Sequence, residues 1–317
     1  MCVTDQRSLA VRGRALLVAL AADVLLGDPP NAWHPVALLG SWMRLGEQLA
    51  PGDGLPRLLY GAAWLAGGLA LAGGITALLP RHTLLQGLAA STLLAYRGLD
   101  RAVGEVQAVL EAGNLDEARR LLGWHLVSRP TADLSPAEVA AAAIESLAEN
   151  LSDSLVAPAL AYLAGGLPGL AIYRLVNTAD AMWGYRDARY EYLGKSAAHL
   201  DDVLNLLPAR LTAVLIALAG QIVQRRGREA WRMARRYAGR TASPNAGWPM
   251  AAMAGALDTT LIKRDHYTLG DGVRPPDPAL IGEGRRIARA AVAMMCILCG
   301  VVAVPHHTEG ESNAYAP

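Results

Sequence analysis

The chain has 317 residues, of which 53% are apolar and only 18% charged, and its net charge at pH 7 is +1. Ordinary soluble domains carry about 25% charged residues, so this composition argues against a soluble enzyme. The 32 glycines suit close packing of helices in lipid, and a lipid bilayer is therefore the expected partner of the chain. The near-neutral net charge gives no signal for nucleic-acid binding.

The N-terminal segment has the elements of a signal peptide, because three arginines precede the apolar run 15–26 and a small-residue tripeptide stands at 19–21. We expect no cleavage, since Asp23 interrupts the run and the run leads directly into the motif GDPPNAWHPV. Two X-Pro steps hold that motif extended, and its His34 is a candidate acid–base group.

Three segments have the length and apolar character of membrane spans: 58–79, 203–223 and 287–304. A fourth, 84–96, is short for a full crossing, and we expect it to complete a hairpin with the first. The sequence therefore predicts an all-α polytopic integral membrane protein with amphipathic cytoplasmic helices.

The segment 155–176 is long enough to cross, but it contains five helix breakers. These are Pro158, Gly165, Gly166, Pro168 and Gly169. Irregular backbone at membrane depth survives only where protein or a watery cavity satisfies it, and broken helices of this kind often line a binding site. An ordinary kinked span is the alternative. We expect at least this one membrane segment to be interrupted and to leave 177–202 accessible from the cytoplasm.

Two polar regions separate the apolar segments, at 97–150 and 224–286. The first is helical by pattern, with helix-capping signals at Asn114 and Ser135. The second opens with seven arginines over 225–240, which indicates a cytoplasmic loop by the positive-inside rule and requires no nucleic acid as a partner.

No repeat of 20–50 residues is visible in the chain. We therefore expect one membrane-embedded catalytic domain over 1–305, with both polar regions on its cytoplasmic side. The acidic tail over 306–317 is predicted to be disordered.

The helix predicted to follow Ser135 carries an unusual set of polar side chains. At 100° per residue, five of them fall within about a third of its circumference: Glu138, Glu145, Glu149, Ser152 and Asp153. A solvated face is the alternative, but no Lys or Arg occurs between 131 and 172 to relieve the repulsion among the acids. We therefore expect Mg²⁺, bound to Glu145, Glu149 and Asp153 and carrying a nucleotide or phosphate.

A second polar cluster lies between apolar runs, where ionisable groups are costly and usually functional. Its acids and amides are Asn177, Asp180, Asp187, Asp201, Asp202 and Asn205. Its cations, which can pair with these acids or bind an anionic substrate, are Arg174, Arg186, Arg189, Lys195 and Arg210. An interfacial loop with internally paired charges is the alternative. Two further motifs follow, one around Asn245 and one, RPPDP, that begins with Arg274.

The chain contains no P-loop, Rossmann, GxSxG or HExxH signature. Seven ordered segments over residues 20–280 instead resemble the motifs of the CobD/CbiB family. They are GDPPNAWHPVALLG, IESLAENLSDSLVAP, GGLPG, YRLVNTADAMWGYRDARY, LDDVLNLLPARLTA, SPNAGWPMAAMAGAL and the RPPDP segment. The chain departs from the family at Pro130, where relatives commonly have aspartate, and Asp133 is a candidate substitute.

The resemblance implies a membrane-bound adenosylcobinamide-phosphate synthase, a C–N bond-forming ligase of cobalamin (vitamin B12) biosynthesis. Such enzymes use ATP to join a propionate carboxylate of the corrinoid adenosylcobyric acid to (R)-1-amino-2-propanol or its O-phosphate. A carboxylate does not react with an amine unaided, so we expect it to be phosphorylated first. Mg²⁺ would offset the charge of the phosphates, and a base would keep the amine neutral.

With this chemistry in view, we assign catalysis to Glu145, Glu149, Asp153, Asp180 and His34. We assign substrate binding to Asn177, Arg174, Arg186, Asp201, Asp202, Asn205, Asn245 and Arg274. Because ATP is a cytoplasmic resource, we expect the active site to face the cytoplasm from the inner membrane. Other membrane enzymes of the same pathway are candidate partners.

Two other classes of protein stay open. The aspartates at 180, 187 and 201–202 superficially resemble the motifs by which membrane prenyltransferases hold a diphosphate through Mg²⁺, although their spacings differ. A transporter would also have broken apolar segments with buried charges, but the chain has few clear spans and no detectable repeated half. Melting of the purified protein with Mg-ATP and a corrinoid, or with a prenyl diphosphate, would distinguish the three classes.

Overall fold

The computed structural model describes residues 3–27 and 34–304. The tail at 306–317, which we predicted to be disordered, and most of the motif GDPPNAWHPV lie outside these residues. The elements are α1 (Val3–Leu26), α2 (Pro35–Gln48), α3 (Leu55–Ala77), α4 (Thr83–Ser91), α5 (Tyr96–Glu111), α6 (Leu115–His125), α7 (Pro136–Leu151), the π-helical turn η2 (Ser152–Val156), α8 (Ala157–Trp183), α9 (Lys195–Leu204), α10 (Leu206–Gln224), α11 (Gly227–Tyr237), the 3₁₀ turn η3 (Ala238–Arg240), α12 (Gly247–Leu257), β1 (Leu261–Lys263), β2 (Tyr267–Leu269) and α13 (Pro278–Ala303).

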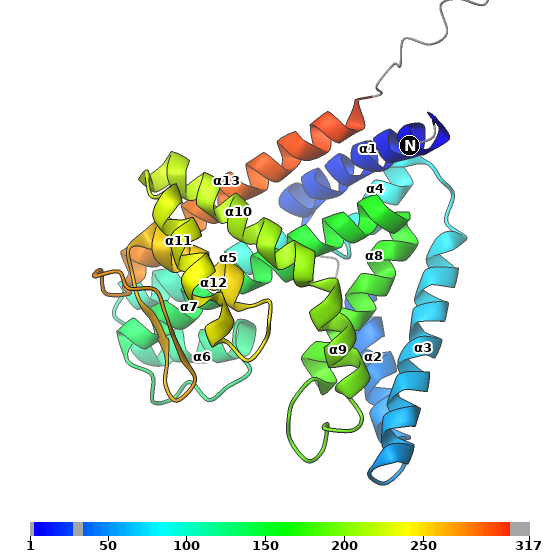
Figure 1. Cartoon of the computed structure of the whole chain (residues 1–317), viewed down its shortest axis with the longest axis horizontal. Coiled ribbons are helices and arrows are strands. Elements are labelled where there is room, and N and C mark those ends of the chain that lie inside the picture. The colour runs from blue at the N-terminus through cyan, green and yellow to red at the C-terminus, as the bar shows by residue number, and fades with distance from the viewer. Residues whose placement is uncertain (1–2, 28–33, 305–317) are drawn as a thin grey trace, which may run out of the picture.

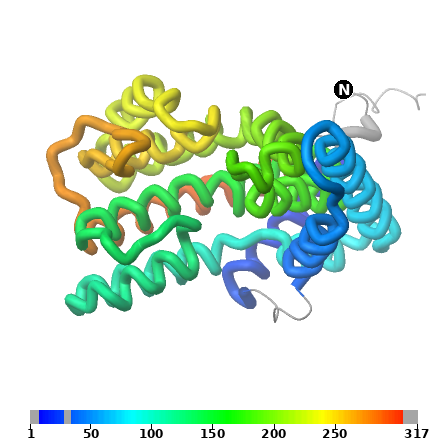
Figure 2. The backbone as a smooth tube through the Cα atoms, turned by 90° about the horizontal axis from the view of Figure 1, so that it is seen from below, coloured from blue at the N-terminus to red at the C-terminus, as the bar shows by residue number. Residues whose placement is uncertain are grey.

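The helices form two groups at opposite ends of an elongated molecule (Figure 1). Helices α2, α3 and α9 pack around the second half of α8, with a small core that includes Leu175 and Trp183. The larger core joins α5, α6, α7, α10, α11 and α12 at the other end. Helices α1 and α13 lie side by side, with Gly13 against Val302 and Ala303. The segment between α12 and α13 loops around the larger group (Figure 2).

Both predicted capping signals are present. Asn114 accepts a hydrogen bond from the backbone N–H of Glu117 (3.2 Å) at the start of α6. Ser135 and Glu138 form a capping box at the start of α7, with Pro136 in the first turn. These local signals therefore fix where the helix that carries the acidic residues begins.

Four helical segments of the described chain are long and apolar enough to cross a membrane, which confirms the all-α polytopic class. They are Leu55–Ala77, Pro136–Trp183, Leu206–Gln224 and Pro278–Ala303. Two predicted boundaries are wrong. The span predicted over 203–223 is divided at Asn205, where α9 ends and α10 begins. The segment 84–96 contains most of the nine-residue α4, which is too short to cross and packs against α1.

The long segment Pro136–Trp183 is not straight. Gly166 has φ 64° and ψ −155°, which is not helical, and the chain turns back on itself at this residue. The 21 residues from Asp153 to Arg174 would extend about 31 Å in a continuous helix. Instead, the Arg174 guanidinium lies 3.4 Å from the backbone carbonyl oxygen of Asp153. The predicted interruption within 155–176 is therefore confirmed, and it has the form of a helical hairpin.

The hairpin turn is closed by a tight contact and by an arginine. A β-carbon on Gly169 would lie only 2.5 Å from the carbonyl oxygen of Ala161, so the two arms touch beside the turn. Arg12 of α1 donates from Nη1 to the carbonyl oxygens of Leu163 (2.9 Å) and Ala164 (2.6 Å). Carbonyls at an interrupted helix need such partners where water is scarce, because an unsatisfied backbone group costs several kcal/mol in lipid.

The middle of helix α7 is buried, whereas Glu138 and Glu149 near its two ends are partly exposed. Every residue from 139 to 148 is buried, including Glu145, which is 6% exposed. The alternative of a solvated acidic face is therefore excluded for Glu145.

Candidate active site

The base of the hairpin is organised around a buried arginine. Asp153 lies in η2, a π-helical turn of the kind that often occurs at functional sites. From the opposite arm, Arg174 donates from Nε to the carbonyl oxygen of Leu93 (2.9 Å) and from Nη1 to Asn177 Oδ1 (3.4 Å). Arg174, which we predicted to bind substrate, thus holds the hairpin arms and the α4–α5 connection together.

Where the hairpin meets α9 and the loop before α12, the chain forms a cavity of about 480 Å³, called here the acidic cavity. Eight of the predicted site residues line it. They are Glu149, Asp153, Asp180, Arg186, Asp201, Asp202, Asn205 and Asn245. Residues separated by almost 100 positions in the chain therefore meet at one site, as expected of a binding or catalytic centre.

Two amides and a tyrosine fix the carboxylate of Asp201. Asn205 donates from Nδ2 to Asp201 Oδ2 (2.9 Å), and Asn177 donates from Nδ2 to Oδ1 (3.5 Å). The Tyr173 hydroxyl in turn donates to Asn205 Oδ1 (3.0 Å), which orients that amide. Burial raises the pKa of Asp201, and the negative charge of Asp202 raises it further. The two amide hydrogen bonds lower the pKa, but by less. The pKa lies above its usual value as a result.

The loop that carries the SPNAGWP motif packs against the end of α9. Asn245 donates from Nδ2 to the carbonyl oxygen of Asp202 (2.7 Å), and Arg210 Nη1 donates to Asn245 Oδ1 (3.2 Å). Arg210 also stacks on Trp248, 4.9 Å from the ring centroid. Asn245 thus joins this loop to α9 and α10 while its side chain borders the acidic cavity.

The β-hairpin supplies side chains that our sequence analysis missed. Strands β1 and β2 pair antiparallel with Lys263 opposite Tyr267, and Lys263 and His266 line the acidic cavity. Ser152, which we placed on the acidic face of the helix, also lines the cavity, as do Tyr185 and Ser243 from two of the quoted motifs. Lys263 and His266 lie in a short stretch without helical or strand periodicity, so no pattern in the sequence marked them.

Cations from elsewhere in the chain compensate part of the charge on α7. Arg264 of the β-hairpin pairs with Glu138, and Arg129 and Lys263 attract Glu145 electrostatically. One carboxylate oxygen of Glu145 is buried and lacks a hydrogen-bond partner among the described residues. The lack of Lys and Arg within α7 itself is therefore not evidence for a metal ion, contrary to our argument from the sequence.

Oxygen donors dominate the acidic cavity. Five carboxylates line it together with Arg186 and Lys263. Within residues 3–27 and 34–304, no three His, Cys, Asp or Glu side chains are placed to hold a metal ion by themselves. The donor set fits a Mg²⁺ ion that arrives with a nucleotide, because Mg²⁺ commonly takes only one or two protein carboxylates and keeps waters and phosphates. Of the three predicted ligands, Glu149 and Asp153 line the cavity and Glu145 does not.

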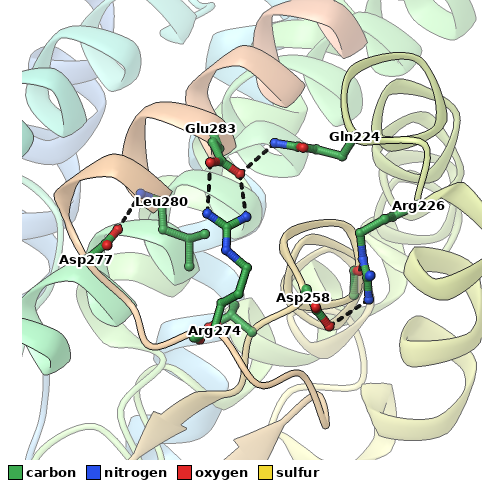
Figure 3. Close-up of polar contacts among 9 residues, drawn as sticks. Gln224, Arg226, Asp258, Arg274, Asp277, Leu280 and Glu283 are labelled. Atoms are coloured by element: carbon green, nitrogen blue, oxygen red, sulfur yellow. Dashed lines mark hydrogen bonds and ion pairs between the residues drawn. The ribbon is translucent and has the colours of Figure 1, made fainter.

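Five predicted residues do not line the acidic cavity: Glu145, Arg174 and Asn177, described above, and His34 and Arg274, which lie in structural contacts elsewhere. His34 begins α2, and its Nδ1 accepts a hydrogen bond from the backbone N–H of Val36 (3.2 Å). Arg274 forms a bidentate ion pair with Glu283 of α13, at 2.7 and 2.9 Å, and Gln224 shares the same carboxylate (Figure 3). These contacts tie the RPPDP segment to α10 and α13.

The fold and the cavity together define a polytopic helical membrane protein with an acidic, amide-lined site at the base of an interrupted hairpin. A family model described as "CobD/Cbib protein" matches residues 16–298. The chain belongs to the CobD/CbiB family.

Relatives from distant organisms resemble most of the chain. The Cobalamin biosynthesis protein CobD of Dehalococcoides mccartyi is 41% identical over 281 residues, which cover 84% of this chain and 89% of the relative. The protein of the same name from Geobacter metallireducens is 36% identical over 92% of this chain and 96% of its own length. That from Klebsiella pneumoniae is 37% identical over 83% and 85%. No solved structure gives a significant match.

Proposed function

We propose that this protein acts in cobalamin biosynthesis as an adenosylcobinamide-phosphate synthase. It joins a propionate carboxylate of adenosylcobyric acid to (R)-1-amino-2-propanol or its O-phosphate, with ATP as co-substrate. The observation that carries the proposal is the convergence of eight family-motif residues on one acidic cavity. The names of the relatives, all cobalamin biosynthesis proteins, support the pathway.

The chemistry has two steps in this proposal. ATP phosphorylates the propionate and leaves as ADP, and the amine then attacks the acyl carbon and displaces phosphate with loss of one proton. Glu149 and Asp153 would hold the Mg²⁺ that accompanies ATP. Arg186 and Lys263, which line the same cavity, neutralise the phosphate oxygens.

The amine needs a base, because it is protonated near neutral pH and a protonated amine cannot attack. Asp201 is suited to this role, since its raised pKa makes it a better proton acceptor than an ordinary carboxylate. The charge of the adjacent Asp202 also favours uptake of a proton by Asp201. Asp180 lines the same cavity and adds a further carboxylate to the site.

The pH dependence of the reaction tests this role. Asn205→Ala removes a hydrogen bond that lowers the pKa of Asp201, so that pKa rises further and less of the base is ionised at a given acidic pH. The acid limb of the kcat/KM profile is expected to move to higher pH. Asn150→Ala is the control, because the Asn150 amide binds Ser146 outside the cavity. An unchanged acid limb in Asn205→Ala would exclude Asp201 as the base.

The cavity opens to the cytoplasm in this proposal, since ATP is available there. Single cysteines at Asp187 and Ala198, in a chain without native cysteines, are expected to react with a membrane-impermeant thiol reagent only after spheroplasts are lysed. Asp187 is exposed and Ala198 lines the cavity, so both report on this face. Labelling of both positions in intact spheroplasts would reverse the proposed orientation.

The activity is tested directly with membranes that contain the protein. Adenosylcobyric acid, Mg-ATP and either aminopropanol or its phosphate are expected to yield an amide adduct that mass spectrometry detects. The adduct should be absent without ATP. Failure to form an adduct with both amines, in membranes that contain folded protein, would refute the proposed reaction.

A further inference from the structure

A second cavity, of about 470 Å³, lies at the turn of the α8 hairpin and shares no lining residue with the acidic cavity. Its walls come from α1, from the connection between α3 and α4, and from the turn itself at 165–168. Neither the proposed reaction nor the family motifs other than GGLPG involve this region.

The charge of this turn cavity is positive. Arg12 and Arg81 line it, and none of the lining side chains that the structure describes is acidic. Arg12 donates from Nη1 to the carbonyl oxygens of Leu163 and Ala164. The N–H groups on its other two nitrogens are left to bind a ligand. Among the residues that the structure describes, neither arginine forms an ion pair. Thr83 and Gln86 add polar groups to the same wall.

The surroundings of the turn cavity are apolar and exposed. Three large side chains near the end of α3, Leu71, Ile75 and Leu78, are 50%, 62% and 85% exposed, and Leu84 and Leu85 at the start of α4 are 51% and 47% exposed. Only 17% of the apolar 18-residue stretch of α3 is buried within the protein. Exposed apolar side chains next to a cationic cavity match a ligand that has both an anionic group and hydrocarbon chains.

We propose that the turn cavity binds one anionic phospholipid, with its phosphate at Arg12 and Arg81 and its acyl chains along α3. The cavity lies beside the apolar surface of a candidate membrane span, so a phospholipid can place its phosphate at the arginines while its acyl chains stay along α3. Free inorganic phosphate is the alternative that the test below distinguishes. Because Arg12 also holds the carbonyls at the hairpin turn, an occupied cavity stabilises the turn at Gly166. This proposal does not depend on the reaction proposed above.

The test uses the full chain, stripped of lipid in a neutral detergent. Phosphatidylglycerol, phosphatidylcholine and inorganic phosphate are added separately, and the melting temperature is recorded. Phosphatidylglycerol is expected to raise the Tm by several degrees, and native mass spectrometry should detect one retained lipid per chain. An equal rise with phosphatidylcholine, or the same rise with inorganic phosphate alone, would overturn the proposal.

Variants locate the effect. Arg81 is exposed and has no hydrogen-bond partner among the described residues, so Arg81→Gln should fold. It is expected to need about fivefold more phosphatidylglycerol for the same Tm rise, and Arg81→Lys should need less than Arg81→Gln. Arg228→Gln removes an exposed arginine from the distant α11 and should behave as the unmodified protein. Equal lipid dependence of Arg81→Gln and Arg228→Gln would contradict binding at the turn cavity.

Discussion

Replacing Glu149 with glutamine is expected to reduce turnover at least about a hundredfold while the protein stays folded. Glu149 lines the acidic cavity, where it and Asp153 are the carboxylates that we assign to Mg²⁺. Glutamine has nearly the same shape but binds Mg²⁺ weakly, so loss of the charge removes a metal ligand without opening a void. The charge of Glu149 is attracted by Lys263 and repelled by Asp201, so its removal loses one interaction and relieves the other, and the Tm should change little.

Three further variants make this result specific. Glu149→Asp keeps a carboxylate and should retain more activity than Glu149→Gln. Glu145→Gln is expected to have a smaller effect than Glu149→Gln, because Glu145 does not line the cavity. Glu111→Gln changes an exposed acid on α5, where its only described partner is Gln107, and should be neutral. Turnover of Glu149→Gln close to that of Glu111→Gln would show that Glu149 has no part in the reaction.

Replacing Gly166 with alanine is expected to lower both the stability and the activity of the protein. The backbone of Gly166, at φ 64° and ψ −155°, lies in a region that only glycine adopts readily. Forcing a β-carbon into this conformation costs about 1–3 kcal/mol, which corresponds to a Tm decrease of several degrees. Activity should also fall, because the turn sets the alignment of Asp153 with Arg174 across the hairpin.

The neighbouring glycine provides a matched control. An added β-carbon at Gly165 meets no atom within 4 Å, and this residue does not have a positive φ. Gly165→Ala is therefore expected to melt within about one degree of the unmodified protein, because exposed substitutions away from strained sites change stability little. Equal stability of Gly165→Ala and Gly166→Ala in a thermal melt would show that the turn is not strained at residue 166.

Much of the site could be predicted because its residues lie in motifs with clear local signals. The spacing of Glu149 and Asp153 indicated one helix face, and the polar residues between apolar runs marked Asp180, Asp201 and Asn205. Hydropathy likewise identified the membrane segments, because a helix needs a run of about 20 apolar residues to cross the hydrocarbon core of a bilayer.

Other features depend on contacts that local patterns do not encode. Lys263 reaches the cavity only because a two-stranded hairpin packs against α7, and three-residue strands leave almost no periodicity to detect. The ion pair of Arg274 could not be predicted, because its partner, Glu283, lies nine residues away across an irregular segment. The breakers near Gly166 predicted an interruption, but neither proline nor glycine content indicates the direction in which a chain continues.

The reversal at Gly166 determines on which side of the membrane the later parts of the chain lie. A count of apolar segments treats Pro136–Trp183 as one crossing, which would put its two ends in opposite compartments. A hairpin instead returns the chain to the side from which it came, whatever depth its turn reaches. The number of membrane crossings up to the end of α8 therefore differs by one from the number of apolar segments. A topology that counts Pro136–Trp183 as one crossing would therefore place Gly184 on the wrong side relative to Pro136.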